Sequence, residues 1–123
     1  MTSFRDLIVW QEAHKLVVKV YSQTKFFPKT ELYGLTNQMR RCSVSISSNI
    51  AEGFSRRSYK EKIQFYSISA GSITELQNQL LIAKDVGYLN AEDLNSLFDQ
   101  TIDVHKLLNA IIKKSSLILN SKF

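Results

Sequence analysis

The densest group of chemically capable side chains lies in the segment Phe54–Lys62, which holds four basic residues, one acid and two aromatic residues. Arginine can form bidentate hydrogen bonds with phosphate oxygens, and tyrosine can stack on an unpaired base, so this composition suits a nucleic-acid contact. The alternative is a solvated corner between two helices, in which Glu52 pairs with Arg56 at i,i+4 spacing. The candidate nucleic-acid contacts are Arg56, Arg57, Tyr59, Lys60 and Lys62, joined upstream by Arg40 and Arg41.

Residues typical of catalysis are few. The chain has no Gly-rich phosphate loop, no GxSxG, no HExxH and no CxxC. His105 falls on an apolar stripe, where a hydrogen-bonded core histidine is the expected role and a proton shuttle the alternative. His14 has no acidic neighbour at i+4, and Cys42 is expected to pack as a small buried hydrophobe rather than act as a nucleophile. We therefore expect no enzyme and no catalytic residues.

A polar series follows the border of one helix face: Gln38, Ser45, Asn49 and Glu52. One interpretation is a hydrogen-bonded network that fixes helix register, and the other is a catalytic carboxylate–amide cluster. We favour the structural interpretation because no second carboxylate or nucleophile is identifiably close.

Four helices must position these side chains, since only one proline and four glycines interrupt the chain. The first is expected to open at a Ser3–Asp6 capping box and to run to about Thr24, and the second to span Leu35–Ser55. A third should follow Ser58 and end before Gly87, and a fourth should be capped by Asn90.

Apolar residues recur at steps of three and four in each helix, which predicts one buried face per helix. In the first two helices the predicted core positions are Leu7, Trp10, Ala13, Val17 and Val20, then Met39, Cys42, Ile46, Ile50 and Gly53. In the last two they are Phe65, Ser69, Ile73, Leu76, Leu80 and Ala83, then Leu94, Phe98, Thr101, His105, Leu108 and Ile112.

Helices of this length joined by short connectors favour antiparallel neighbours. The predicted fold is all-α, an antiparallel up-and-down four-helix bundle, with residues 1–123 as a single domain. The tail Leu117–Phe123 either extends the last helix or packs separately. Away from the core, Val44, Ser47 and Ala51 form a small surface that is either an interface with another subunit or a solvated serine-rich face.

The net charge of +5 is uneven: residues 1–62 carry 11 basic and 5 acidic side chains, and residues 63–123 carry 5 and 6. This asymmetry hints at a polyanionic partner, although solubility alone also explains it. One cysteine forms no internal disulfide, and with two histidines it is a poor zinc set, so neither metal nor cofactor is expected. No apolar run is long enough to cross a membrane and the N-terminus has no signal-peptide pattern, so we expect a cytoplasmic protein.

Several segments together resemble the 23S rRNA intervening-sequence protein family: Phe4–Ala13, Phe27-Pro28, Tyr33–Leu35, Gln38–Arg41, Ser48–Gly53 and Ser69–Leu76. The family's small four-helix bundles are similar to the accessory variability determinants of diversity-generating retroelements. That similarity implies a homo-oligomer, with a pentamer favoured, a nucleic-acid partner, and a reverse transcriptase or other protein partner. Residue by residue, it reaches Arg40, Arg41 and Arg56, while Arg57, Lys60 and Lys62 depend on the local charge pattern alone.

The sequence thus leads to one principal hypothesis and one alternative. The principal hypothesis is a non-enzymatic nucleic-acid-binding accessory protein, acting on structured RNA through basic residues repeated around a homo-oligomer. The alternative is a protein–protein assembly module whose positive charge is incidental.

Overall fold

The computed structural model describes residues 2–121, and within that range the secondary structure is entirely helical. The four long helices are α1 (Ile8–Thr24), α2 (Leu35–Ser55), α3 (Tyr59–Asp85) and α4 (Ala91–Asn120). Two short 3-10 helices, η1 (Phe4–Asp6) and η2 (Lys29–Glu31), precede α1 and α2. The predicted all-α class is confirmed, and the tail continues α4 as far as Asn120, while residues 122 and 123 lie outside the described range.

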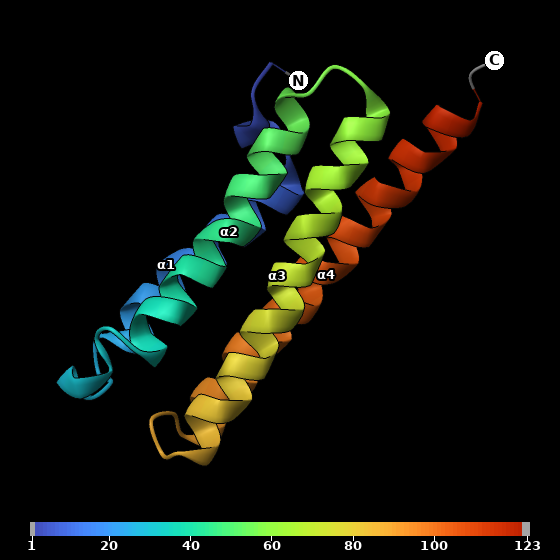
Figure 1. Cartoon of the computed structure of the whole chain (residues 1–123). Helices are drawn as coiled ribbons and strands as arrows, with labels where there is room; N and C mark the ends of the chain where they lie inside the picture. Colours follow the sequence, from blue (N-terminus) through green and yellow to red (C-terminus); the bar gives the residue numbers. More distant parts are fainter. Residues whose placement is uncertain (1, 122–123) are drawn as a thin grey trace.

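The four helices run alternately up and down and form a bundle (Figure 1). Helix α1 packs against α2 and α4, and α3 packs against the same two helices, so each helix covers two neighbours. We call one end of the bundle the corner end: it gathers η1, the α2–α3 turn at residues 56–58 and the last turns of α4 (Figure 1). The opposite, far end carries the loop at residues 25–34 and the α3–α4 turn at residues 86–90.

The helix ends are set largely by the predicted caps. The Ser58 hydroxyl accepts from the Glu61 N–H at 3.1 Å, and the Asn90 side chain accepts from the Asp93 N–H at 2.7 Å. Gly87 has a φ of 89°, the left-handed conformation that closes α3.

The prediction was wrong at the first helix. The Ser3–Asp6 capping box forms, but it caps η1, because Leu7 adopts an extended conformation that separates η1 from α1.

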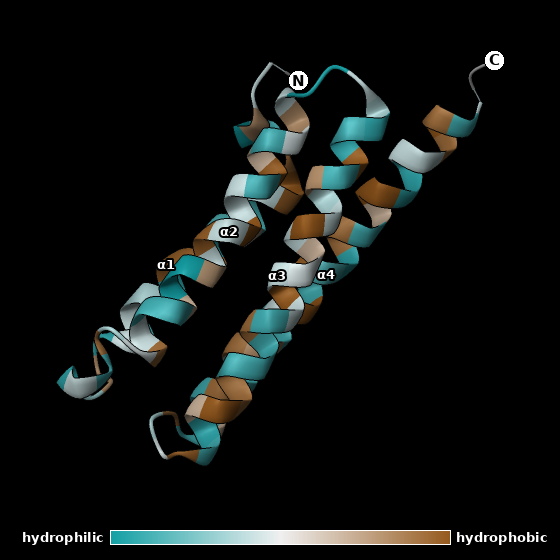
Figure 2. Cartoon of the chain, in the orientation of Figure 1, coloured by the Kyte–Doolittle hydropathy of each residue, from teal (hydrophilic) through white to brown (hydrophobic). Residues whose placement is uncertain are grey.

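The predicted core is confirmed for α2, where all five positions are buried. Figure 2 shows hydrophobic and hydrophilic residues interleaved along every helix, as amphipathic helices in a bundle require. In α1 the buried face uses Val9 and Leu16 where Trp10 and Val17 were predicted. Because each helix packs against two others, its buried face is wider than one stripe and its centre is displaced from the predicted line.

The same displacement corrects α4, where Leu97 and Val104 are fully buried and His105 is only partly buried. Within residues 2–121 the His105 ring makes no hydrogen bond, so the predicted hydrogen-bonded core histidine was wrong.

Helices α2 and α3 pack closely at a glycine. Gly53 is buried, and a Cβ built on it would lie 2.5 Å from Cε1 of Tyr66. The Tyr66 ring is itself only 2% exposed. The ring therefore occupies the space that any larger residue at position 53 would need.

Replacing Gly53 by alanine is expected to lower the free energy of unfolding by about 1–3 kcal/mol, because the new methyl group overpacks against Tyr66. Gly71→Ala is the matched control: it lies within α3, and a Cβ there meets nothing within 4 Å. In that variant the free energy of unfolding should rise by about 0.5–1 kcal/mol, because alanine has a higher helix propensity than glycine. Urea denaturation followed by circular dichroism measures both, and equal shifts in the two variants would contradict the steric explanation.

Candidate nucleic-acid interface

The α2–α3 turn brings the basic residues of the Phe54–Lys62 segment to the corner end of the bundle. The turn needs only residues 56–58, since α2 ends at Ser55 and α3 begins at Tyr59. The turn is strongly hydrophilic in Figure 2. Its side chains nevertheless differ in how freely they can reach a ligand.

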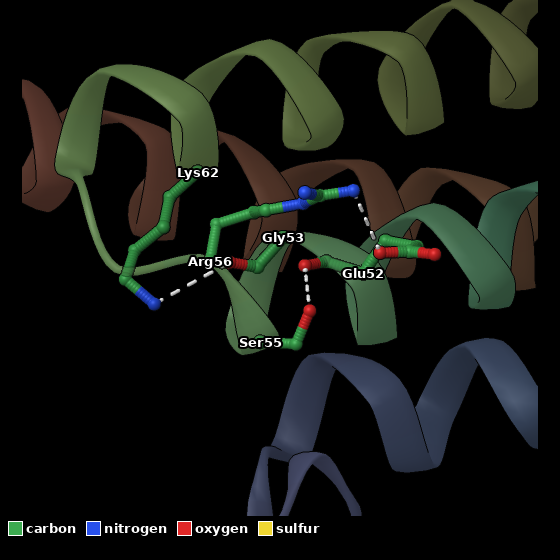
Figure 3. Close-up of polar contacts among 5 residues, drawn as sticks. All are labelled: Glu52, Gly53, Ser55, Arg56 and Lys62. Atoms are coloured by element: carbon green, nitrogen blue, oxygen red, sulfur yellow. Dashed lines mark hydrogen bonds and ion pairs between the residues drawn. The ribbon is translucent and has the colours of Figure 1, made fainter.

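Arg56 folds back along α2 (Figure 3). Its Nη2 lies 3.3 Å from Glu52 Oε2, which confirms the predicted i,i+4 pair, and its guanidinium lies 4.7 Å from the centroid of the Phe65 ring. Its Nε is buried without a hydrogen-bond partner. The charge is therefore held between α2 and α3, where it links the two helices.

Lys62 reaches from the first turn of α3 to the end of α2 (Figure 3). Its Nζ donates to the Phe54 carbonyl at 2.7 Å and to the Gly53 carbonyl at 3.4 Å. Both carbonyls belong to the last turn of α2. The Gly53 carbonyl also accepts from the Arg56 N–H at 3.3 Å, whereas no backbone N–H of the described residues reaches the Phe54 carbonyl. Burial lowers the pKa of the Lys62 ammonium, and the group acts as a C-terminal cap for α2.

Arg57 and Lys60 behave differently, because both are exposed and neither forms an ion pair or hydrogen bond within residues 2–121. Tyr59 is half-buried and lines a pocket of about 240 Å³ together with Lys62 and Lys114. We call this the corner pocket.

Two cations at the corner end were missed by sequence reasoning. Arg5 of η1 and Lys114 of α4 are both exposed there. They are distant from the Phe54–Lys62 segment along the chain, so only the closing of the bundle places them near it. The spacing of residues in the sequence carried no signal for either.

Arg40 and Arg41 do not join this group. They lie some 16 residues before the turn, about 24 Å away at 1.5 Å per residue. Arg40 is half-buried: its Nε donates to Thr24 Oγ1 at 2.9 Å, and its guanidinium lies 4.8 Å from the Tyr21 ring centroid. Arg41 is exposed and lines a separate polar pocket of about 520 Å³ with Tyr33 and Glu75.

Within the polar series on α2, Ser45 is the residue that bonds to α3, whereas Gln38 and Glu52 are exposed and Glu52 pairs with Arg56. Asn49 Nδ2 donates to the Ser45 carbonyl at 2.8 Å, and the Ser45 and Ser72 hydroxyls lie 2.9 Å apart. The Cys42 thiol donates to the Ser72 carbonyl at 3.0 Å, and burial, reinforced by Glu75, raises the pKa of that thiol to about 12. A thiol held protonated at neutral pH is a poor nucleophile, and these contacts support the register-fixing interpretation.

The proposed interface residues are only partly available. Val44 is 38% exposed, whereas Ser47 and Ala51 are half-buried. The Ser47 hydroxyl donates to the Val44 carbonyl at 3.2 Å, and Ala51 lines a shallow hollow with Phe4 of η1. Val44 is the member of the set that a second copy could reach without disturbing the chain's own contacts.

Residues 2–121 contain neither a cluster of metal-ligating side chains nor a membrane-spanning helix. No group of three or more His, Cys, Asp or Glu side chains in this range is placed to hold a metal ion. None of the helices there combines the length and the apolar character that crossing a bilayer requires.

Comparisons with known proteins agree with this geometry. A family model described as 23S rRNA-intervening sequence protein matches residues 5–110. No curated protein matches the chain. The fold is similar to the crystal structure of a protein of unknown function from the S23 ribosomal protein family of Bacteroides thetaiotaomicron, with a TM-score of 0.81 and 23% identity, over 86% of this chain and 96% of that one.

Replacing Lys62 by methionine keeps the length of the side chain but removes the cap on the Phe54 and Gly53 carbonyls. We expect the free energy of unfolding to fall by about 1 kcal/mol, the usual net contribution of such hydrogen bonds. Lys60→Met is the control and should stay within about 0.5 kcal/mol of the parent, because Lys60 is exposed. Thermal and urea unfolding measure both, and equal stabilities would show that the cap adds nothing.

Proposed function

The chain belongs to the 23S rRNA-intervening sequence protein family, and we propose that it is a non-enzymatic nucleic-acid-binding protein that acts on structured RNA as a homo-oligomer. The observation that carries the proposal is the gathering of exposed cations from three distant segments at the corner end: Arg5, Arg57, Lys60 and Lys114. Exposed, unpaired cations exchange their counterions for phosphates at little cost in desolvation, which is how non-specific affinity for nucleic acids arises.

Within this proposal the predicted contacts divide into two roles. Arg57 and Lys60 contact phosphates directly, because nothing in the described part of the chain competes for their charges. Arg56 and Lys62 hold the turn in shape through their bonds to Glu52 and to the end of α2, and the 41% exposed side chain of Arg56 can in addition meet a ligand at its edge. Tyr59 lines the corner pocket, so an unpaired base that enters the pocket would stack there.

The second candidate is a protein–protein assembly module, and an exposed apolar residue of α4, Leu117, favours it. Leu117 is 63% exposed, and Figure 2 shows hydrophobic turns near the C-terminal end of α4. In this function the partner is another protein, a reverse transcriptase among them, and the corner cations serve solubility. Nuclease treatment during co-purification separates the two functions, because only a nucleic-acid-mediated complex falls apart.

The double variant Arg57→Ala, Lys60→Ala tests direct phosphate contact. The slope of log affinity against log salt should become shallower by about two units per engaged subunit, because each lost phosphate contact removes roughly 0.9 for a duplex. Affinity should fall alike on every sequence, since phosphates carry no base identity. Fluorescence anisotropy with an RNA hairpin and a single strand, from 50 to 300 mM salt, measures this.

The matched control is Lys15→Ala, Lys106→Ala, which removes the same charge from exposed positions away from the turn. It should leave the slope nearly unchanged. If the two double variants lower the slope equally, the cations at the corner end have no special role in binding. If the parent protein binds no RNA or DNA at about 50 mM salt, the assembly function takes precedence.

Assembly is tested most cleanly at Val44, because substitution of Ala51 would also disturb η1. Val44→Arg should dissociate the homo-oligomer, for which a pentamer is our expectation, by placing an unpaired charge in an interface. The far-ultraviolet circular dichroism should stay helical. Multi-angle light scattering measures the mass, and a parent protein that is monomeric at micromolar concentration would refute the proposed assembly.

A further inference from the structure

A hollow of about 380 Å³ opens at the far end of the bundle, where α1 ends and α2 begins. Its rim carries three cations, Lys25, Lys29 and Arg40, and no acidic side chain lines it. Both lysines are exposed, and neither forms an ion pair within residues 2–121. The hollow therefore concentrates positive charge that the described chain leaves uncompensated.

Arg40 is pre-positioned at this hollow. Its Nε donates to Thr24 Oγ1 at 2.9 Å, and the Thr24 hydroxyl in turn donates to the Val20 carbonyl at 2.7 Å. Its guanidinium also lies 4.8 Å from the centroid of the Tyr21 ring. These contacts fix one edge of the guanidinium, and its terminal nitrogens form no hydrogen bond within residues 2–121. Little side-chain entropy therefore remains to be lost on binding an anion.

The Thr36 hydroxyl adds a neutral donor to the cations of the hollow. Thr36 is only 3% exposed, and it lines the hollow. Its hydroxyl forms no hydrogen bond within residues 2–121, so it is free to donate to a ligand in the hollow. A bound oxygen in the hollow would accept that hydrogen bond.

Glu31 is the acid nearest to these cations along the chain, and its carboxylate oxygens accept hydrogen bonds outside the hollow. One carboxylate oxygen accepts from the Leu35 N–H at 3.1 Å, and the other accepts from the Tyr88 hydroxyl at 2.7 Å. The Tyr88 bond, helped by the Leu35 N–H, lowers the pKa of the Glu31 carboxyl. The carboxylate thus caps α2 and anchors the loop, and it does not line the hollow.

We infer that this hollow binds a phosphate group through Lys25, Lys29, Arg40 and the Thr36 hydroxyl. Phe27, Pro28 and Leu32 also line it, so the phosphate is carried on an organic group that covers these apolar side chains. A nucleoside 5′-phosphate fits this description, either as a free mononucleotide or as the 5′ end of a nucleic acid. The site is separate from the corner end and does not depend on the function proposed for it.

The test uses the full chain and adenosine 5′-monophosphate, with adenosine and inorganic phosphate as comparison ligands. Amide chemical shifts of Thr36 and Arg40 should move and saturate with the monophosphate, move less with inorganic phosphate, and stay still with adenosine. A hexanucleotide with a 5′-phosphate, compared with the same hexanucleotide with a 5′-hydroxyl, tells whether a nucleic-acid end also enters. Equal shifts with adenosine and its monophosphate would overturn the inference.

Two variants locate the site. Lys25→Ala, Lys29→Ala should weaken monophosphate binding about tenfold or more, because charged hydrogen bonds are lost, and Thr36→Val should weaken it several-fold. Arg57→Ala, Lys60→Ala removes the same charge at the corner end and should leave monophosphate binding unchanged. Equal losses in the two double variants would reduce the effect to net charge and refute the site. Loss of hairpin binding in the corner variant, with monophosphate binding intact, bears on the proposed function alone.

Discussion

The contact between the Tyr66 ring and the backbone of Gly53 sets how closely α2 and α3 approach at the corner end. The other corner contacts depend on that spacing. Lys62 reaches the last carbonyls of α2 only because α3 starts close beside them, and Arg56 bridges Glu52 and Phe65 across the same gap. A larger residue at position 53 would separate the helices, lengthen both bridges and change where the turn directs its exposed side chains.

The basic character of the first half of the chain has more than one physical role. Arg56 and Lys62 are part of the fold at the corner end, and Arg40 is part of the α1–α2 junction. Arg57 and Lys60 project into solvent and are available to a ligand. A count of charges treats these residues as equal, whereas the structure distinguishes those that stabilise it from those that it displays.

Much of the fold could be predicted from the sequence because its signals are local. The bounds of α2 and the caps at Ser58, Asn90 and Gly87 depend on residues within a few positions of each helix end. The buried faces of α1 and α4 were predicted less well, since they depend on which two neighbours each helix meets. For the same reason Arg5 and Lys114 went unnoticed and the hydrogen bond from Arg40 to Thr24 was not foreseen: each concerns a contact between segments distant in sequence.

The split between structural and displayed cations also bears on how this chain can evolve. Substitutions at positions 56 and 62 change the stability of the fold and the surface together, so selection on folding restrains them whatever the ligand is. Positions 57 and 60 lie on the same turn without that restraint. Single substitutions at these two positions can therefore change the surface that a partner meets. They do so without destabilising the fold, so a change of partner does not require a variant that fails to fold.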